Sequence, residues 1–346
     1  MQLTRTVAAL FRIIASACVA TAILLVPTNA TAQGTKVKFG YFPAMVDTPV
    51  FIAASQGIFA KNGLDVEMIL FTSGPALIGS LLSGSTPVVD VGALLTFQQV
   101  AKGHDIRGLS HYWSSNFYSL IARSDLATPN AGKPYPAPIL DLKGKKLGVV
   151  ALGSATAAFA ETILKDAGLQ PGTDVTIVPA GAIATAAATL VSGGIDAYIS
   201  YAPMNQLLDA RNPGSYKLLV APEQFPAAIQ VNLYPHAATT QKYISANPLV
   251  ADAICKSIEQ SLAFLADPNN FDAAVVGLEK WLPGNPPGVI AAALKVSLPQ
   301  ILGDRKRLGK ITPEQVKNAS DQMLAIGYTS QAVTYDPYVY RSSTCN

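Results

Sequence analysis

Several residue types are scarce in this chain of 346 residues. It has three Cys and three His, and charged residues make up only 14% of it. So few Cys and His exclude a zinc ribbon, an iron–sulfur cluster or a dense disulfide scaffold, so we expect no metal and no cofactor. The formal net charge of +3 argues against a protein that coats nucleic acid.

Half of the residues are hydrophobic, so the chain folds, and its length is typical of two domains. The N-terminus has Arg5 and Arg12, then an apolar run over 13–26, then small residues at 30–32. This order predicts a cleaved signal peptide over 1–32 and a soluble periplasmic protein. The alternative is a membrane anchor, but a helix of the apolar run would rise only about 21 Å, short of the roughly 30 Å hydrocarbon core.

Two cysteines remain after such cleavage. Cys255 falls in a predicted helix and Cys345 lies next to the C-terminus. In an exported protein they could form a disulfide that ties the tail to the helix, or they could stay as two free thiols. The sequence leaves both possibilities open.

Past Gln33 the chain alternates between strand-like and helix-like segments. This alternation predicts an α/β fold with parallel sheets covered on both faces. After a Pro-rich break at 129–138 it starts again. The expected strands are 36–41, 65–71, 88–92 and 145–150, and the first expected helices are 48–61, 74–82 and 94–102.

An internal repeat indicates two lobes built on one plan. Residues 65–84 and 174–193 each begin with Asp-Val at a strand and end with Ser-Gly at a helix end. Each copy is followed by an apolar strand expected to contain an acid, Asp90 in the first and Asp196 in the second. We therefore predict two doubly wound α/β lobes.

The connections between these lobes define a hinge and a cleft. The stretch 106–122 leads into the second lobe, and 216–220 followed by 227–233 could return to the first. Lobe I then covers 35–115 plus 225–346, lobe II covers 120–222, and a ligand cleft lies between them. The helices expected after Thr239 are 242–244, 249–265, 271–281, 290–302 and 313–326.

Several motifs in order carry a family resemblance: KFGYFP at 38–43, AASQGIFAKNGL at 53–64, LKGKKLGV at 142–149 and YISANP at 243–248. With the two Ser-Gly helix ends, they make the chain resemble the nitrate, sulfonate and taurine-binding family of periplasmic solute-binding proteins. The resemblance implies a type II periplasmic-binding-protein fold that closes on its ligand by hinge motion. It also implies a monomer that delivers a small molecule to an ABC permease and its ATPase.

Four turns are candidates for ligand binding, because ligands in open α/β sheets bind beyond the carboxyl ends of strands and at helix N-termini. The alternative for each turn is ordinary helix capping by Ser or Thr. Aromatic residues at strand ends could add an apolar wall. The candidate ligand-binding residues are Tyr41, Phe42, Pro43, Met45, Thr72, Ser73, Gly74, Ala93, Leu94, Leu95, Trp113, Gly153, Ser154, Ala155, Thr156 and Tyr201.

The expected ligand is a small organic anion, a sulfonate or carboxylate whose body can be aromatic. None of the four turns contains the Arg or Lys that usually binds such an anion. The same turns therefore suit a pyrimidine or another heteroaromatic molecule as an alternative.

The sequence contains none of the usual hydrolase or nucleotide-binding motifs, so we expect no enzyme. Enzymes that build the thiamine pyrimidine share this lobe plan but depend on a cysteine cluster, which is missing here. A secreted hydrolase remains the alternative from another class. It would require His111, Ser154 and an acid to converge in the cleft.

Overall fold

A computed structural model describes residues 34–346, apart from 114, 227–228, 230–235 and 304–308. The predicted signal peptide over 1–32 lies outside the described residues, as does nearly all of the predicted return segment 227–233. Among the described helices, none is long and apolar enough to cross a membrane.

The first sheet, sheet A, has five strands in the order β2-β1-β3-β10-β4. Strand β1 runs parallel to β2 and β3, and β10 runs antiparallel to β3 and β4. All four residues of β3 are buried, so this strand lies in the centre of the core. The strands are β1 (Thr35–Tyr41), β2 (Leu64–Leu70), β3 (Val88–Val91), β4 (Ile106–His111) and β10 (His236–Thr240).

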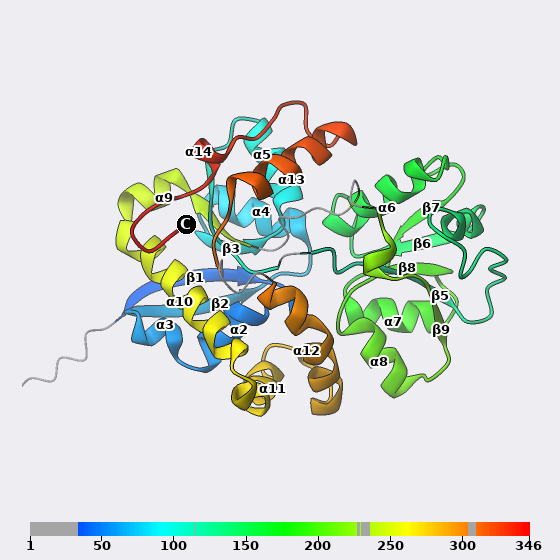
Figure 1. The fold of residues 1–346 in the computed structure, drawn as a ribbon, viewed down its shortest axis with the longest axis horizontal. Coiled ribbons are helices and arrows are strands. Elements are labelled where there is room, and N and C mark those ends of the chain that lie inside the picture. The colour runs from blue at the N-terminus through cyan, green and yellow to red at the C-terminus, as the bar shows by residue number, and fades with distance from the viewer. Residues whose placement is uncertain (1–33, 114, 227–228, 230–235, 304–308) are drawn as a thin grey trace, which may run out of the picture. The chain divides into compact units, whose positions relative to one another are not determined.

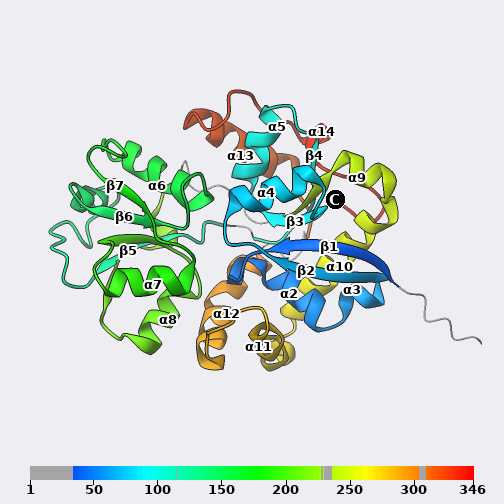
Figure 2. The ribbon, with the colours of Figure 1, turned by 180° about the vertical axis from the view of Figure 1, so that it is seen from behind.

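Helices cover both faces of sheet A (Figure 1). Helices α2, α3 and α10 contact one another on one face, and α4 and α5 lie on the other, as the reverse view also shows (Figure 2). These helices are α2 (Thr48–Ser55), α3 (Ile58–Lys61), α4 (Gly74–Ser83), α5 (Ala93–Ala101) and α10 (Pro248–Ala266).

The single helix expected over 48–61 is two helices. Gly57 lies between α2 and α3 with a φ of +66°, a left-handed conformation that glycine adopts at little cost. This residue breaks the helical path, so α3 leaves at a new angle.

The second sheet, sheet B, has the order β7-β6-β8-β5-β9. Strand β6 runs parallel to β7 and β8, and β5 runs antiparallel to β8 and β9. Helix α6 lies on one face and α7 and α8 on the other (Figure 1). The elements are β5 (Ser119–Arg123), β6 (Lys146–Val149), β7 (Thr176–Pro179), β8 (Ala197–Ser200), β9 (Tyr216–Val220), α6 (Ala155–Asp166), α7 (Ile183–Val191) and α8 (Met204–Arg211).

The expectation of wholly parallel sheets was wrong, because both sheets are mixed. In each sheet four strands run in one direction, and helices connect the three of them that pair directly with one another. The one antiparallel strand of each sheet follows, along the chain, the edge strand of the other sheet. Strand β5 of sheet B comes after β4 of sheet A, and β10 of sheet A comes after β9 of sheet B. The chain thus crosses between the sheets twice, and each incoming strand is inserted one place from the edge.

The internal repeat corresponds to equivalent elements. Residues 65–84 lie in β2 and α4, and residues 174–193 include β7 and α7, which hold the same places in their sheets. The two acids, however, are not equivalent. Asp90 is the third residue of β3, whereas Asp196 precedes β8 and pairs with Arg123 at an N–O distance of 3.6 Å.

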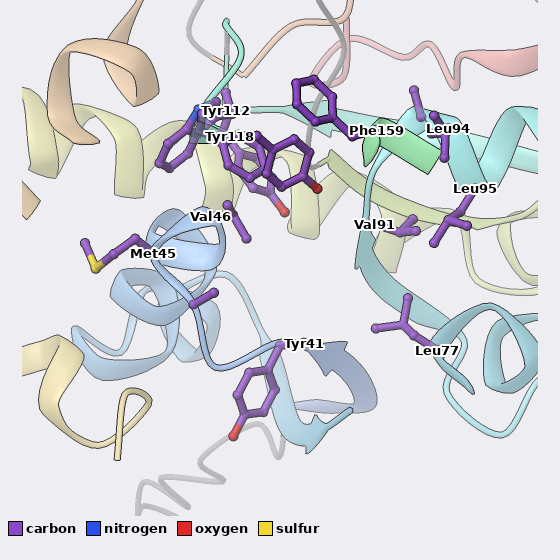
Figure 3. Packing of buried hydrophobic residues seen from close by; sticks show 14 of the residues in the cluster. Tyr41, Met45, Val46, Leu77, Val91, Leu94, Leu95, Tyr112, Tyr118 and Phe159 are labelled. Carbon is purple, nitrogen blue, oxygen red and sulfur yellow. The ribbon is translucent and has the colours of Figure 1, made fainter. Parts of the chain in front are cut away.

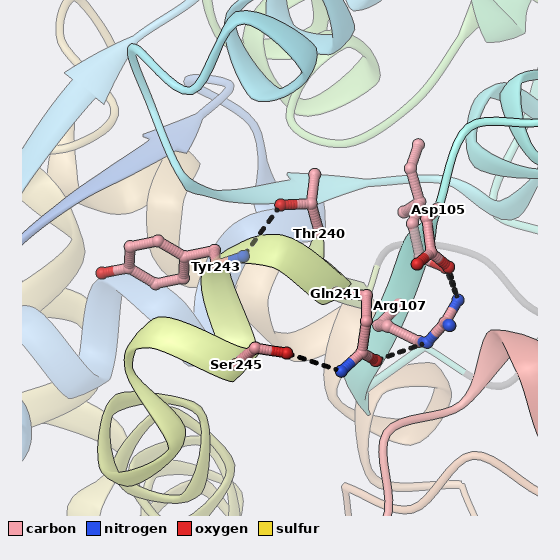
Figure 4. A network of polar contacts seen from close by, with 7 residues as sticks. Asp105, Arg107, Thr240, Gln241, Tyr243 and Ser245 are labelled. Carbon is pink, nitrogen blue, oxygen red and sulfur yellow. Dashed lines mark hydrogen bonds and ion pairs between the residues drawn. The ribbon is translucent and has the colours of Figure 1, made fainter.

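The remaining helices follow β10 or lie in connections. A polar network joins β4 to the start of this region (Figure 4). Arg107 forms an ion pair with Asp105 and donates through Nε to Gln241 Oε1 at 3.0 Å. Gln241 Nε2 in turn donates to Ser245 Oγ at 3.2 Å. The elements are α9 (Gln241–Ala246), α11 (Phe271–Glu279), α12 (Pro287–Leu302), α13 (Pro313–Ala325), α14 (Tyr335–Tyr338), and the 3-10 helices η2 (Met45–Asp47), η3 (Ala137–Leu142), η4 (Pro222–Gln224) and η5 (Pro268–Asn270).

The two cysteines form a disulfide. Cys255 on α10 is bonded to Cys345, 90 residues further along the chain, and both side chains are buried. Of the two possibilities left open by the sequence, the structure has the bonded one, which ties the C-terminal tail to α10.

We expect loss of this disulfide to destabilise the protein. Replacing both cysteines, Cys255→Ser with Cys345→Ser, should lower the free energy of unfolding by about 2–5 kcal/mol, because the bond restricts a long loop of the unfolded chain. Chemical denaturation followed by circular dichroism measures this change, and intact mass confirms the bond in the parent. Equal denaturation midpoints for parent and variant would contradict the expectation.

Candidate functional site

A pocket with a cavity volume of about 120 Å³ lies where turns from both sheets meet. The turns that follow β1, β3 and β6 all contribute, so the pocket lies at the carboxyl ends of parallel strands, where open α/β sheets bind ligands. It is lined by Phe42, Ala44, Val46, Asp47, Gly74, Asp90, Val91, Gly92, Ala93, Leu94, Leu95, Phe117, Tyr118, Val150, Ser154, Ala155, Thr156, Phe159, Thr162, Tyr201, Ile229, Gln322 and Ile326.

The turn after β1 is held by its own side chains. Asp47 Oδ2 accepts a hydrogen bond from the backbone N–H of Phe42 at 2.7 Å, and Thr48 Oγ1 donates to the carbonyl of Met45 at 2.6 Å. The backbone N–H of Met45 donates to the carbonyl of Ala202, after β8, at 3.3 Å. These bonds fix Phe42 and Asp47 at the pocket and link sheet A to the turn that carries Tyr201.

The start of α6 supplies the corresponding turn from sheet B. Ser154 is the N-cap, and its Oγ accepts from the N–H of Ala157 at 3.3 Å and lies 2.9 Å from Thr156 Oγ1. Thr156 Oγ1 in turn accepts from the N–H of Val150 at 2.9 Å. Both hydroxyls therefore shape the turn, and the N–H groups of Ala155 and Thr156, which lack partners within the helix, can meet a ligand.

Aromatic side chains form one wall of the pocket. The ring of Tyr118 lies near that of Phe159 (Figure 3), with 5.0 Å between their centroids. Its centroid lies 4.5 Å from that of Phe117 and 6.2 Å from that of Tyr201. Burial raises the pKa of Tyr201 to about 12, so its hydroxyl stays protonated at neutral pH. The wall suits a flat or apolar ligand body.

Two acids, Asp47 and Asp90, are the most unusual lining residues. The two residues are 0% and 1% exposed, and the side chain of Asp90 interacts with those of Asp47 and Tyr112. Asp47 Oδ1 and both carboxyl oxygens of Asp90 nevertheless have no hydrogen bond of good geometry within the described part of the chain. Burial raises the pKa of Asp90 to about 7. Burial, together with the charge of Asp90, raises that of Asp47 well above its usual range.

The structure brings some of the predicted site residues together and places others elsewhere. Tyr41 packs on Phe51 and Trp281 at 5.3 and 5.7 Å, Met45 is fully buried, and Trp113 lies behind the wall, 5.2 Å from Phe117. The predicted residues that line the pocket are Phe42, Gly74, Ala93, Leu94, Leu95, Ser154, Ala155, Thr156 and Tyr201; the others, Tyr41, Pro43, Met45, Thr72, Ser73, Trp113 and Gly153, are outside the lining.

The candidate turn at 72–74 and the candidate turn at 153–156 lie against each other. A side chain at Gly153 would first meet Pro75, the residue after Gly74, at 3.8 Å. Ser73, like Ser154, caps its helix and accepts a hydrogen bond from the N–H of Ala76. The capping role that the sequence offered as the alternative is therefore present at both turns, together with their position at the pocket.

Sequence reasoning missed four lining residues of consequence. No motif points to Asp47, and Asp90 stands out in the sequence only as part of the repeat, although an acid between valines in a buried strand is a usable signal. Gln322 and Ile326 come from α13 and its end, far along the chain from the other lining residues. No local pattern could have placed them at the pocket.

The hydrolase alternative required His111, Ser154 and an acid to meet. Ser154 lines the pocket, but its hydroxyl is held by the N–H groups of Ala151 and Ala157 and by Thr156. His111 is in β4, where it pairs with His236 in the sheet and bonds through its backbone to Gly309. The geometry therefore gives that alternative no support.

Comparisons with known proteins agree with this architecture. The chain is 24% identical over 254 residues to a protein of Brucella abortus that is named as a proposed binding protein, covering 73% of this chain and 72% of the relative. The alkanesulfonate-binding protein of Xanthomonas axonopodis superposes with a TM-score of 0.70 at 19% identity, over 90% of this chain and 99% of the other. The periplasmic nitrate-binding protein of Synechocystis gives 0.68 at 15% identity, over 88% and 84%.

The fold is that of the periplasmic binding proteins: two mixed sheets with flanking helices. A family model described as the NMT1-like family matches residues 30–277, so this chain belongs to that family. The predicted resemblance to the nitrate- and sulfonate-binding proteins is confirmed, and the relatives with such names are binding proteins rather than enzymes.

The buried acids predict an unusual pH dependence of stability. Because the pKa of Asp90 is higher in the folded state than the ordinary value near 4, folding favours its neutral form. Its contribution to stability is complete below about pH 4 and is lost as the pH rises through about 7. We expect Asp90→Asn to gain stability relative to the parent as the pH rises from 5 to 8.

Thermal unfolding of the ligand-free proteins at several pH values measures this difference. Asp196→Asn, which changes an acid outside the pocket lining, serves as the control and should differ from the parent by a constant amount. A difference between parent and Asp90→Asn that does not change between pH 5 and 8 would contradict the expectation.

Proposed function

We propose that the protein is an exported solute-binding protein that captures a small organic molecule and delivers it to an ABC permease and its ATPase. The observation that carries this proposal is the pocket itself, which is built from turns of both sheets at the carboxyl ends of their parallel strands. The names of the similar binding proteins support the same role.

We propose that the two sheets belong to two lobes, 35–115 plus 225–346 and 120–222, that close on the solute about a hinge. The two crossings of the chain between the sheets support such a hinge. Contacts such as Met45 to Ala202 join the two lobes beside the pocket and would form on closure. We further propose a monomer that acts in the periplasm after removal of residues 1–32.

The size and lining of the pocket limit the solute. A cavity of about 120 Å³ is close to the roughly 150 Å³ that accommodates benzene in a known case. The aromatic wall favours a single ring or a short apolar chain. The first N–H groups of α6 can bind an acceptor, as a sulfonate or carboxylate requires, but the lining includes no Lys, Arg or His within the described part of the chain. A neutral heteroaromatic molecule is the second candidate, and the rings of Tyr118 and Phe159 favour it.

A screen by thermal unfolding tests the proposed function. Alkyl and aryl sulfonates, aromatic carboxylates, nitrate and nitrogen heterocycles would each be added to the exported form of the protein. A true solute at about 100 times its dissociation constant should stabilise the fold by roughly 2.7 kcal/mol, a shift of about 2–4 °C. Product formation from any of these compounds would instead indicate an enzyme.

A pair of glycine variants on one helix tests the location of the site. A side chain at Gly74 would collide with Leu95, which also lines the pocket, whereas one at Gly79 meets nothing within 4 Å. We expect Gly74→Leu to push Leu95 into the pocket and to weaken binding at least tenfold for the compound that stabilises the parent. Gly79→Leu should bind like the parent. Calorimetric titration measures both, and equal affinities for the two variants would remove this turn from the site.

A further inference from the structure

Two buried carboxyl groups, far apart in the sequence, lie beside each other at the same edge of sheet A. Asp47 ends the turn after β1, and Asp90 is near the end of β3, the strand that pairs with β1. The two side chains interact electrostatically, because the charge of Asp90 contributes to the raised pKa of Asp47. Both residues line the pocket, and both are buried.

A buried carboxylate normally has a cation or several hydrogen-bond donors as partners. Here the N–H of Phe42 bonds to Asp47 Oδ2, and the other polar neighbours are neutral or acidic, because the two carboxyl groups interact with each other and Asp90 with the hydroxyl of Tyr112. Among the described residues, Asp47 Oδ1 and both Asp90 oxygens still lack a hydrogen bond of good geometry. The lining side chains in the described part of the chain carry no positive charge that could serve. Native structures rarely leave such groups unsatisfied without a functional reason.

A metal ion is a poor occupant for this pair. In the described ranges, no group of three or more His, Cys, Asp or Glu residues could hold a metal. Two carboxyl groups are fewer than the three protein ligands of even an open zinc site. An organic cation needs fewer contacts, because one ammonium or amidinium group can donate several hydrogen bonds at once.

We infer that Asp47 and Asp90 form a subsite for a positively charged nitrogen group, an ammonium or an amidinium, on the solute. This inference rests on the proposed solute-binding function and names the solute class. The aromatic wall of Phe117, Tyr118 and Phe159 then contacts the apolar body of the solute. The charged group supplies the donors that the carboxyl oxygens lack.

Three probes of one shape test the charge preference. Benzamidine, benzamide and benzoate share a phenyl ring and a planar head group, and they differ in charge from positive through neutral to negative. Acetamidine, acetamide and acetate repeat the comparison with a smaller body. Calorimetric titration of the exported protein at pH 7.5 should give at least tenfold tighter binding for an amidine than for the matched amide and carboxylate.

Variants assign the preference to these two acids. Asp90→Asn and Asp47→Asn keep the side-chain shape and should each weaken amidine binding at least tenfold while changing amide binding little. Asp196→Asn, outside the pocket, should bind the amidine as the parent does. A circular dichroism spectrum of each variant checks that it has folded, and if one variant does not fold, the other carries the test.

The outcomes separate this inference from the proposed function. Tighter binding of benzoate or acetate than of the matching amidine would overturn the cationic subsite and leave a solute-binding protein for anions. Amidine binding that survives both Asn variants would also overturn it. If none of the six probes binds, the inference fails, and the broader screen alone decides whether the protein binds another solute.

Discussion

The site depends on one geometric constraint, that the parallel strands of each sheet end at the same edge. Strands β1 and β3 of sheet A, and β6 of sheet B, all deliver their following turns to the pocket. The inserted antiparallel strand β5 adds to this edge, because it begins where β8 ends, so Phe117 and Tyr118 arrive just ahead of it. The position of the pocket therefore follows from strand direction before any side chain is considered.

Burial of charge sets the second constraint, and it opposes stability. A wall of aromatic and aliphatic side chains lowers the polarity around Asp47 and Asp90, and this raises the pKa of both. The protein would be more stable with neutral side chains there, as is common for groups that serve binding rather than folding. The same low polarity strengthens any interaction that a charged solute group makes with the ionised member of the pair.

The sequence predicted the fold better than the site, for physical reasons. Hydrophobic periodicity and the Ser-Gly helix ends predict local elements, so α4 and α7 were expected close to where they lie. The two antiparallel strands were missed altogether, because 106–122, which contains most of β5, was predicted to be a connection between lobes and no strand was predicted at β10. Their direction follows from their entry from the other sheet, which no local pattern shows. Tyr41 and Tyr201 both follow the pattern of an aromatic at a strand end, yet only Tyr201 reaches the pocket, because Tyr41 packs on Trp281 from a distant helix connection.

The repeat shows how a duplicated plan produces an unequal site. Register aligns Phe39 with Val88 in sheet A and Leu147 with Ala197 in sheet B, so the position that Asp90 holds in β3 is held in β8 by Ile199. Sheet A thus contributes acids to the pocket, whereas sheet B contributes the N-terminus of α6. A solute with a positive group at one end and an acceptor at the other would bind in a single orientation, because each half of the pocket repels the end that the other half attracts.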